Sequence, residues 1–283
     1  MNFRALTRTG HWPTLAAAFF YFDLSFMVWV MLGPLAVHIA RDLALNPAQK
    51  GVMVAIPVLC GALLRVVMGL LVDRMGAKRA GLAGQLVVIA ALVWGWLGGL
   101  ESLSPVYLMG VLLGVAGASF AVALPLASRW YPPEHQGLAL GIAGAGNSGT
   151  VLAALFAPSL ANAFGWKAVF GIALVPMLVA LAVYTIFAKE PPDHPPPQRL
   201  VQYLSVLHDP DTWWFMFFYS VTFGGFVGLA SWLVIYFNDQ YGLSPVTAGF
   251  FTAACMFAGS IAGTAAAVAR SRAARPLETA LHV

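Results

Sequence analysis

Charged residues are scarce in this sequence, at 9% of its 283 residues, whereas hydrophobic residues reach 60%. Soluble domains carry about 25% charged residues, so this shortage excludes an ordinary water-soluble globular protein. Cysteine is equally scarce, because Cys60 and Cys255 are the only two and both lie inside apolar segments. Their placement argues against a disulfide framework or a cysteine metal site, and it predicts that both thiols are packing residues.

Catalytic groupings and metal-ligand clusters are also lacking. The six histidines are dispersed, no serine, histidine and aspartate form a nucleophile pattern, and no phosphate-binding loop is present. We therefore expect neither an enzyme nor a bound cofactor or metal. The net charge of +4 does not indicate a nucleic-acid partner, because the basic residues are scattered over loops rather than gathered on one face.

Long apolar segments are what the sequence has in abundance. A bilayer core about 30 Å thick requires about 20 apolar residues in a helix. Eight segments of about this length lie at residues 14–39, 51–72, 80–100, 105–127, 137–163, 168–188, 213–237 and 247–269. The first is too long for a signal peptide, so we treat it as a retained helix. The sequence predicts an all-α protein with about eight transmembrane helices in a lipid bilayer.

A proline-rich segment divides these helices. Five prolines fall within residues 191–197, and such a run cannot continue a helix. Six helices, a long linker and further helices are typical of transporters built from two six-helix halves. We expect an N-terminal six-helix bundle at 1–188, a cytoplasmic linker at 189–212, the first two helices of a second bundle at 213–269, and a basic cytoplasmic tail at 270–283.

Basic residues are divided unevenly between the two sets of loops. If the N-terminus lies in the cytoplasm, the inner segments hold eleven of the fifteen lysines and arginines, and the outer loops hold Arg41, Lys50 and Lys167. Because loops rich in lysine and arginine stay in the cytoplasm, we predict a multi-pass protein of the cell membrane with both termini in the cytoplasm.

Arg65 lies in the middle of the second apolar segment, where a charge costs at least about 2.5–3.5 kcal/mol. It is about two helical turns from either end, too far for its side chain to reach water easily. Its guanidinium stays charged and offers a planar fork of donors that suits an oxyanion. Arg65 therefore either binds an anion, or pairs with Asp23 or a backbone carbonyl and only holds helices together.

Asp23 is the one carboxylate that we place inside an apolar segment. A carboxylate in this position can carry protons, or it can accept hydrogen bonds as a contact between helices. We favour the structural role, because Asp23 lies only about nine residues into its segment.

The loop after the second apolar segment carries a family motif. Residues 69–79 read GLLVDRMGAKR, which resembles the G-x-L-x-D-R-x-G-x-K-R signature of the major facilitator superfamily and has the same place between helices two and three. The resemblance implies a cytoplasmic gate, in which a carboxylate and cations form a charged network and cap helix ends without binding substrate. The corresponding residues are Gly69, Asp73, Arg74, Gly76, Lys78 and Arg79.

Glycines recur in the fifth apolar segment, where residues 141–150 read GIAGAGNSGT. Glycines on neighbouring turns allow another helix or a small ligand to approach the backbone, and a buried amide such as Asn147 demands partners. Residues 143–149 resemble the A-G-x-G-N-x-G signature of the nitrate/nitrite porter family. Similar stretches surround it, so the resemblance runs from about residue 14 to about residue 262.

The resemblance implies an anion site assembled from several helices. Its residues are Arg65, Asn147, Gly144, Gly146, Gly149, Phe120, Tyr219 and Phe223. Arg65 corresponds to the family's anion-binding arginine, Asn147 to the signature amide, and the aromatic residues to those that enclose the anion. Tyr219 and Phe223 share a helix face at this spacing, although Phe120 and Phe223 can also be packing or lipid-facing residues.

The sequence departs from the family near its end. Members usually have about twelve helices, with a second signature and a second anion-binding arginine in the second half, and neither is recognisable here. We expect a truncation or a change of reading frame near Ala262.

The resemblance predicts a secondary transporter that moves nitrate, nitrite or both by alternating access, in the context of nitrate assimilation. Exchange of the two anions and symport with protons both remain open. Alternatives are a carrier of another small anion, such as formate or cyanate, and a truncated membrane fragment that does not transport.

Overall fold

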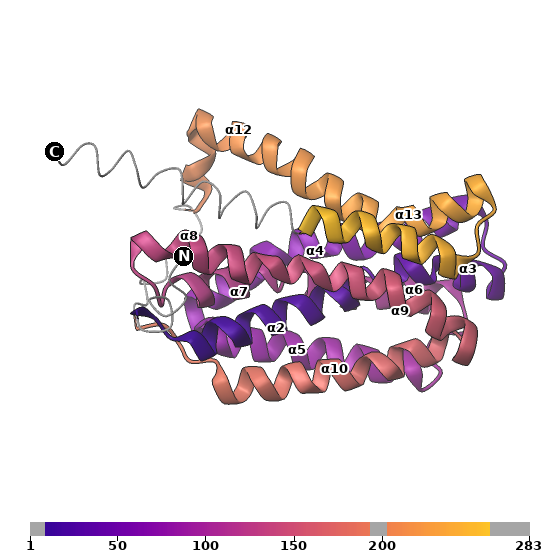
Figure 1. The fold of residues 1–283 in the computed structure, drawn as a ribbon, viewed down its shortest axis with the longest axis horizontal. Helices are drawn as coiled ribbons and strands as arrows, with labels where there is room; N and C mark the ends of the chain where they lie inside the picture. Colours follow the sequence, from indigo (N-terminus) through magenta and orange to yellow (C-terminus); the bar gives the residue numbers. More distant parts are fainter. Residues whose placement is uncertain (1–8, 193–202, 261–283) are drawn as a thin grey trace.

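A computed structural model of the chain describes residues 9–192 and 203–260. Within these ranges every regular element is helical, and the helices run side by side (Figure 1). Seven helical segments of the described residues are long and apolar enough to cross a membrane, and a shorter apolar helix, Pro245–Ser260, follows them. The predicted all-α bundle of about eight membrane helices is confirmed. The predicted basic tail at 270–283 and the expected break near Ala262 lie outside the described residues.

Several spans consist of shorter helices joined end to end. The first span comprises α2 (Trp12–Trp29) and α3 (Leu32–Asp42), the fourth α6 (Leu103–Gly117) and α7 (Phe120–Ser128), the fifth α8 (Pro133–Gly144), η1 (Ala145–Ser148) and α9 (Gly149–Phe164), and the seventh α12 (Pro210–Tyr219), η3 (Ser220–Gly224) and α13 (Gly225–Tyr241). The second, third and sixth spans are α4 (Pro47–Met75), α5 (Ala77–Trp96) and α10 (Trp166–Phe187), and η2 (Ser205–His208) precedes α12.

Local chemistry sets helix ends that the sequence predicted only approximately. The Asn46 side chain accepts the N–H of Gln49 at 2.8 Å, and the Gln49 side chain accepts that of Asn46 at 3.0 Å, so a capping box starts α4. At the other end Gly76, with a φ of 90°, separates α4 from α5. The third predicted segment reached residue 100, but α5 ends at Trp96, ahead of Gly98 with a φ of 107°.

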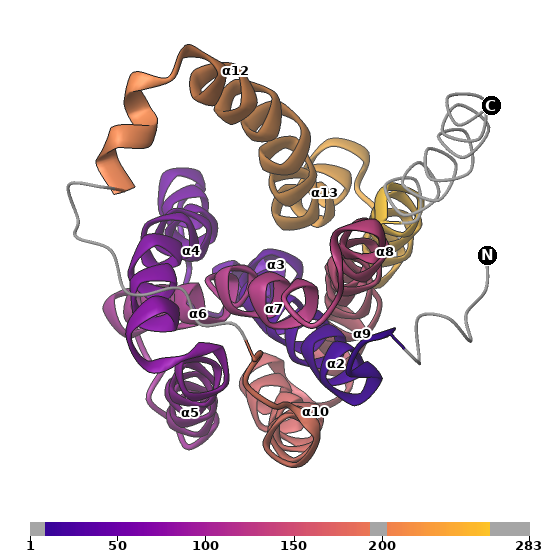
Figure 2. The same cartoon turned by 90° about the vertical axis from the view of Figure 1, so that its left-hand side faces the viewer.

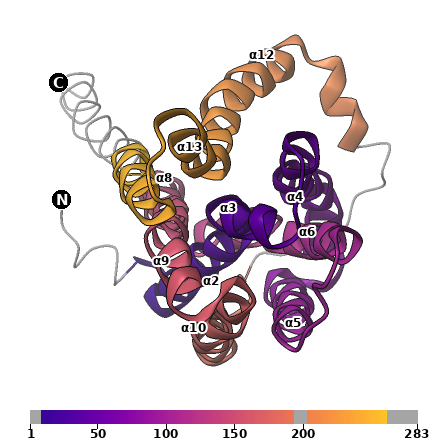
Figure 3. The same cartoon turned by 90° about the vertical axis from the view of Figure 1, so that its right-hand side faces the viewer.

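The first span occupies the middle of the bundle, with α4 to α10 around it (Figures 2 and 3). Large apolar side chains of this span, among them Phe22, Phe26 and Leu32, are completely buried. By contrast, Leu59, Leu63 and other side chains on the outer face of α4 are exposed. In a membrane protein such a face contacts lipid, which explains why the whole helix is apolar.

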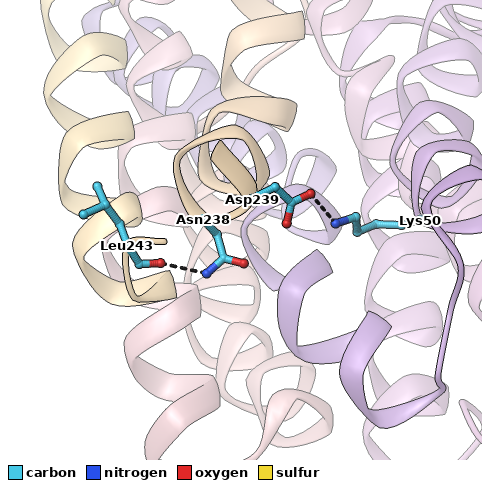
Figure 4. A network of polar contacts seen from close by, with 4 residues as sticks. All are labelled: Lys50, Asn238, Asp239 and Leu243. Atoms are coloured by element: carbon cyan, nitrogen blue, oxygen red, sulfur yellow. Dashed lines mark hydrogen bonds and ion pairs between the residues drawn. The ribbon is translucent and has the colours of Figure 1, made fainter. Parts of the chain in front are cut away.

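The seventh span is joined to the six-helix bundle mainly at one end. There α13 packs against α3, where a Cβ at Gly33 would meet a carbonyl oxygen of α13 at 2.3 Å. Nearer the end of α13, Lys50 Nζ lies 2.6 Å from Asp239 Oδ2, and Asn238 Nδ2 donates to Leu243 O at 2.7 Å (Figure 4). At the opposite end α12 diverges from α4 (Figures 1 and 2).

Two glycines of the fifth span allow it to touch the first. A Cβ at Gly149 would lie 1.7 Å from the carbonyl oxygen of Asp23, and one at Gly146 would lie 2.5 Å from the Phe22 ring. A Cβ at Gly144, in contrast, would have no described atom within 4 Å. The close approach of the two spans therefore depends on Gly146 and Gly149 but not on Gly144.

Gly149→Ala is expected to destabilise the protein by about 1–3 kcal/mol or more, because the added methyl group collides with backbone that cannot rotate away. Gly144→Ala is the matched control: the same change in the same span should be neutral, or stabilising by up to about 1 kcal/mol through helix propensity. Thermal unfolding in detergent measures both. Equal melting temperatures for the two variants would contradict the close contact at Gly149.

Candidate anion-binding site

The guanidinium of Arg65 lies between α4, the end of α6 and the seventh span. Its Nη2 donates to Gly117 O at 3.2 Å, and its Nη1 donates to Tyr219 OH at 3.4 Å. Gly117 is the last residue of α6, where backbone carbonyls lack partners within the helix. The Arg65 Cζ atom is 4.7 Å from the ring centroid of Phe120 and 5.2 Å from that of Phe223. Three of the predicted site residues therefore surround a fourth, the Arg65 cation.

The aromatic residues near this cation are a stacked pair, Tyr219 and Phe223, and a separate ring, Phe120. Tyr219 and Phe223 stack with centroids 4.9 Å apart and an interplanar angle of 13°, so the two rings share a face, as their spacing predicted. The π-helical segment η3 begins directly after Tyr219 and includes Phe223. Such π-helical bulges are frequent at functional sites. The Phe120 ring lies 5.8 Å from that of Phe223. These contacts leave Arg65 beside rings and not beside a carboxylate.

No acidic side chain pairs with Arg65 among residues 9–192 and 203–260. Its Nε is buried and has no hydrogen-bond partner in the same part of the chain. Of the two structural contacts expected from the sequence, the carbonyl contact is present and the pairing with Asp23 is not. A guanidinium held only by neutral groups keeps its full charge available to an anion.

Two cavities adjoin the stacked pair of Tyr219 and Phe223. One, of about 190 Å³, is bordered by Arg65 and Trp29. The other, of about 640 Å³, has Asn147 on its wall, and Asn147 Oδ1 is buried without a partner among the described residues. Arg65 and Asn147 therefore do not line a common cavity in this conformation, although the same two rings border both.

Trp29 is a residue of this region that sequence reasoning missed. A Cβ at Gly117 would lie 2.3 Å from its indole, and one at Gly61 would lie 2.7 Å from it. The indole Nε1 donates to Pro57 O at 2.7 Å, and the side chain is only 2% exposed. Trp29 packs against Gly117, and the carbonyl of Gly117 accepts a hydrogen bond from Arg65. Trp29 therefore positions the guanidinium indirectly, through Gly117. In the sequence, no local pattern relates Gly61 or Gly117 to Trp29.

Asp23 faces the fifth span, and its side chain is 7% exposed. Its Oδ1 accepts a hydrogen bond from Ser148 Oγ at 2.6 Å, next to the backbone contact at Gly149. No lysine or arginine pairs with it in the part of the chain that the structure describes. Asp23 thus joins the first span to the fifth beside the site.

The predicted gating loop lies at the end of the bundle where α12 diverges. Asp73 Oδ1 is 3.8 Å from Arg129 Nη2, and its other oxygen accepts a hydrogen bond from Tyr203 OH. Arg74 is exposed. A Cβ at Gly69 would meet open space, so nothing in the structure explains this glycine.

A residue that is distant in the sequence caps the helix that begins in this loop. Glu190 accepts the backbone N–H groups of Ala77 and Lys78 at 3.1 and 2.8 Å, which caps the start of α5. A Cβ at Gly76 would lie 2.4 Å from the Glu190 carboxylate. The cap and this close approach account for Gly76, whereas Arg79 is exposed. Sequence reasoning predicted helix capping in this loop but did not identify Glu190, which follows α10.

Comparisons with known proteins agree with this architecture. The sequence model of the Major Facilitator Superfamily matches residues 17–279. A probable nitrate/nitrite transporter of Mycobacterium tuberculosis, NarK2, is 33% identical over 256 residues, covering 89% of this chain and 65% of that protein. The nitrite extrusion protein of Bacillus subtilis is 31% identical over 228 residues, covering 81% of this chain and 57% of that protein. The chain thus spans less than two thirds of these curated relatives.

A solved structure shares the fold. A bacterial homologue of the human lysosomal transporter Spinster, in an inward-facing and unoccupied conformation, superimposes with a TM-score of 0.67. It is 21% identical in sequence, and the match covers 86% of this chain and 59% of that chain. The family match extends over nearly the whole sequence and the helical bundle agrees with it, so the chain belongs to the Major Facilitator Superfamily.

Proposed function

We propose that this protein is a secondary transporter that moves nitrate, nitrite or both across the cell membrane by alternating access. The observation that carries the proposal is Arg65, a cation within a membrane span that has no acidic partner among the described residues. A charge at this depth requires a counter-charge or a polar cavity. A small bound anion supplies the counter-charge. The names of the relatives in Mycobacterium and Bacillus support nitrate and nitrite as that anion.

The geometry around Arg65 suits a planar anion. A guanidinium binds an oxyanion through parallel N–H groups in one plane, and nitrate places its three oxygens in one plane. The contact from Nη1 to Tyr219 OH is long, at 3.4 Å, so an anion can replace it at little cost. The rings of Phe120 and Phe223 flank the guanidinium and would exclude water from the bound ion, which strengthens the charge interaction.

The different packing at the two ends of the helix bundle supports alternating access. The ends of α4 and α13 are joined by the Lys50–Asp239 ion pair, while α12 diverges at the end that carries Asp73 (Figure 1). We infer a conformation closed at the outer side and open toward the cytoplasm, with the N-terminal bundle at 1–188 and the helices after the linker as the two moving parts. The inward-facing conformation of the Spinster homologue supports this assignment.

The orientation of the chain is part of the same proposal. The excess of lysine and arginine in the segments on the side of Asp73 supports placing that side, and both termini, in the cytoplasm. Lys50 and Asp239 would then face the outside. Exchange of nitrate for nitrite requires only the anion site, whereas symport also requires a group that carries protons, for which Asp23 is the candidate.

Arg65→Lys is expected to lose nitrate affinity almost as completely as Arg65→Ala. Lysine restores the charge but not the planar fork, and its ammonium group is more strongly hydrated. The loss should be about 1.5–3 kcal/mol, or roughly tenfold or more in affinity. Asn147→Ala should weaken binding less, because a neutral amide contributes less than a charge. Nitrate titration of tryptophan fluorescence in detergent measures these affinities.

Thermal unfolding of the same variants is the control for folding. The proposal requires Arg65 variants that unfold near the temperature of the unchanged protein and yet bind nitrate weakly. Folded Arg65 variants with unchanged nitrate affinity would remove this residue from the site. Tighter binding of formate or cyanate than of nitrate by the unchanged protein would favour the alternative carriers.

Asp23 is expected to act as a contact between spans. Asp23→Ala removes the acceptor for Ser148 and should cost about 1–3 kcal/mol, with equal losses of nitrate–nitrite exchange and of uptake driven by a pH gradient. Asp23→Asn keeps an oxygen acceptor and should retain most of both activities. Proteoliposome assays measure nitrate–nitrite exchange and pH-driven uptake separately. Loss of pH-driven uptake alone in Asp23→Asn would contradict the structural role and identify Asp23 as the proton carrier.

A further inference from the structure

A third cavity, separate from the two beside Tyr219 and Phe223, lies at the end of the bundle opposite the gating loop. It has a volume of about 620 Å³ and lies between the ends of α3, α9 and α10, which Figure 3 shows side by side. Its wall includes His38 and Arg41 from α3 and Lys167 from α10. None of its lining residues belongs to the cavities beside Tyr219 and Phe223.

Positive charge exceeds negative charge in this cavity, which we call the basic cavity. Arg41 and Lys167 form no ion pair among the described residues, and Lys167 Nζ lies 5.5 Å above the Trp166 ring. Asp42 is the one acid on the wall, and its Oδ2 is occupied by a 2.9 Å hydrogen bond from Trp166 Nε1. The first turn of α10, which starts at Trp166, adds the positive end of a helix dipole.

His38 supplies an unused polar atom in the same wall. Its Nε2 lies 2.6 Å from Asn162 Oδ1, which fixes the ring. Its Nδ1 is buried and has no hydrogen-bond partner in the described part of the chain. Because Nε2 donates to an amide oxygen, Nδ1 of the neutral ring is an acceptor and does not itself bind an anion. The anionic ligand is indicated by Arg41 and Lys167, the two cations of the wall that form no ion pair among the described residues.

An apolar groove of about 270 Å³ continues this cavity toward the middle of the membrane. It is lined by apolar side chains of α2, α9 and α10 and by Met31, which precedes α3. On α9, Leu160 lines the groove and Phe164, four residues later, lines the basic cavity. On α10, Val169 lines the groove and Trp166, three residues earlier, lines the basic cavity. Because such pairs lie about one helical turn apart, the two spaces follow each other along the same two helices.

We propose that the basic cavity and the apolar groove together bind one anionic glycerophospholipid. The phosphate head group lies beside Arg41 and Lys167, and part of an acyl chain fills the groove. An inorganic phosphate ion would use only the basic cavity, and a neutral lipid would gain nothing from its charge. Only a molecule that is anionic at one end and apolar at the other matches both spaces. The bound lipid would tie the first, fifth and sixth spans together at this end of the bundle.

Native mass spectrometry of the whole chain released from detergent, with added phosphatidylglycerol, tests the proposal. The unchanged protein should retain one tightly bound lipid. Arg41→Gln/Lys167→Gln should weaken this binding by roughly tenfold or more, since each basic residue contributes about 1 kcal/mol toward an anionic lipid. Lys189→Gln, at an exposed lysine on the opposite end of the bundle, is the matched control and should bind normally.

The groove is tested by Ile172→Trp, at a groove residue that is 37% exposed, where we expect a larger side chain to fill the groove without disturbing the core. This variant should lose phosphatidylglycerol while keeping its thermal stability in detergent. Glycerol phosphate and phosphatidylcholine, offered in place of phosphatidylglycerol, should each bind at least about tenfold more weakly. Phosphatidylglycerol binding that is unchanged in either the double variant or Ile172→Trp would overturn the proposal. So would equal binding of glycerol phosphate or of phosphatidylcholine.

Discussion

A guanidinium that must remain charged within a membrane span is the constraint on which the rest of the site depends. Arg65 meets it with a backbone carbonyl, a phenolic hydroxyl and two ring faces. None of these neighbours carries a negative charge, so they orient the cation without neutralising it. In the proposed function, this arrangement leaves the cation attractive to a small anion, as an anion carrier requires.

Interrupted helices supply the polar groups of the site. The carbonyl that holds Arg65 is available because α6 ends at Gly117. Asn147 lies in the short 3-10 helix η1, and of the stacked pair Tyr219 directly precedes the π-helical segment η3 while Phe223 lies within it. Irregular backbone at membrane depth is tolerated where protein buries it or where it lines a cavity. The breaks in the fifth and seventh spans lie beside the two cavities at this site, and the break in the fourth span supplies the carbonyl that holds Arg65.

Properties that belong to a single segment were predictable from the sequence. The apolar segments and the shared face of Tyr219 and Phe223 appear in the structure as expected. Contacts between distant segments were not, because no local pattern specifies them. The placing of Trp29 behind Gly117 and the binding of Glu190 to the start of α5 depend on how the spans pack. For the same reason no local pattern predicted that Arg65 and Asn147 would line neighbouring cavities on either side of the rings of Tyr219 and Phe223.

The most direct test of the anion site is a distance measurement by solid-state NMR. Protein labelled with ¹³C at the arginine Cζ atoms is reconstituted in lipid with ¹⁵N-nitrate, and dipolar dephasing between the two labels is recorded. Nitrate bound to Arg65 should give dephasing for a separation of about 4 Å, as two charge-assisted N–H···O contacts require. This signal should disappear in Arg65→Lys. Dephasing of equal size in Arg65→Lys, or none in the unchanged protein at saturating nitrate, would contradict an anion site at Arg65.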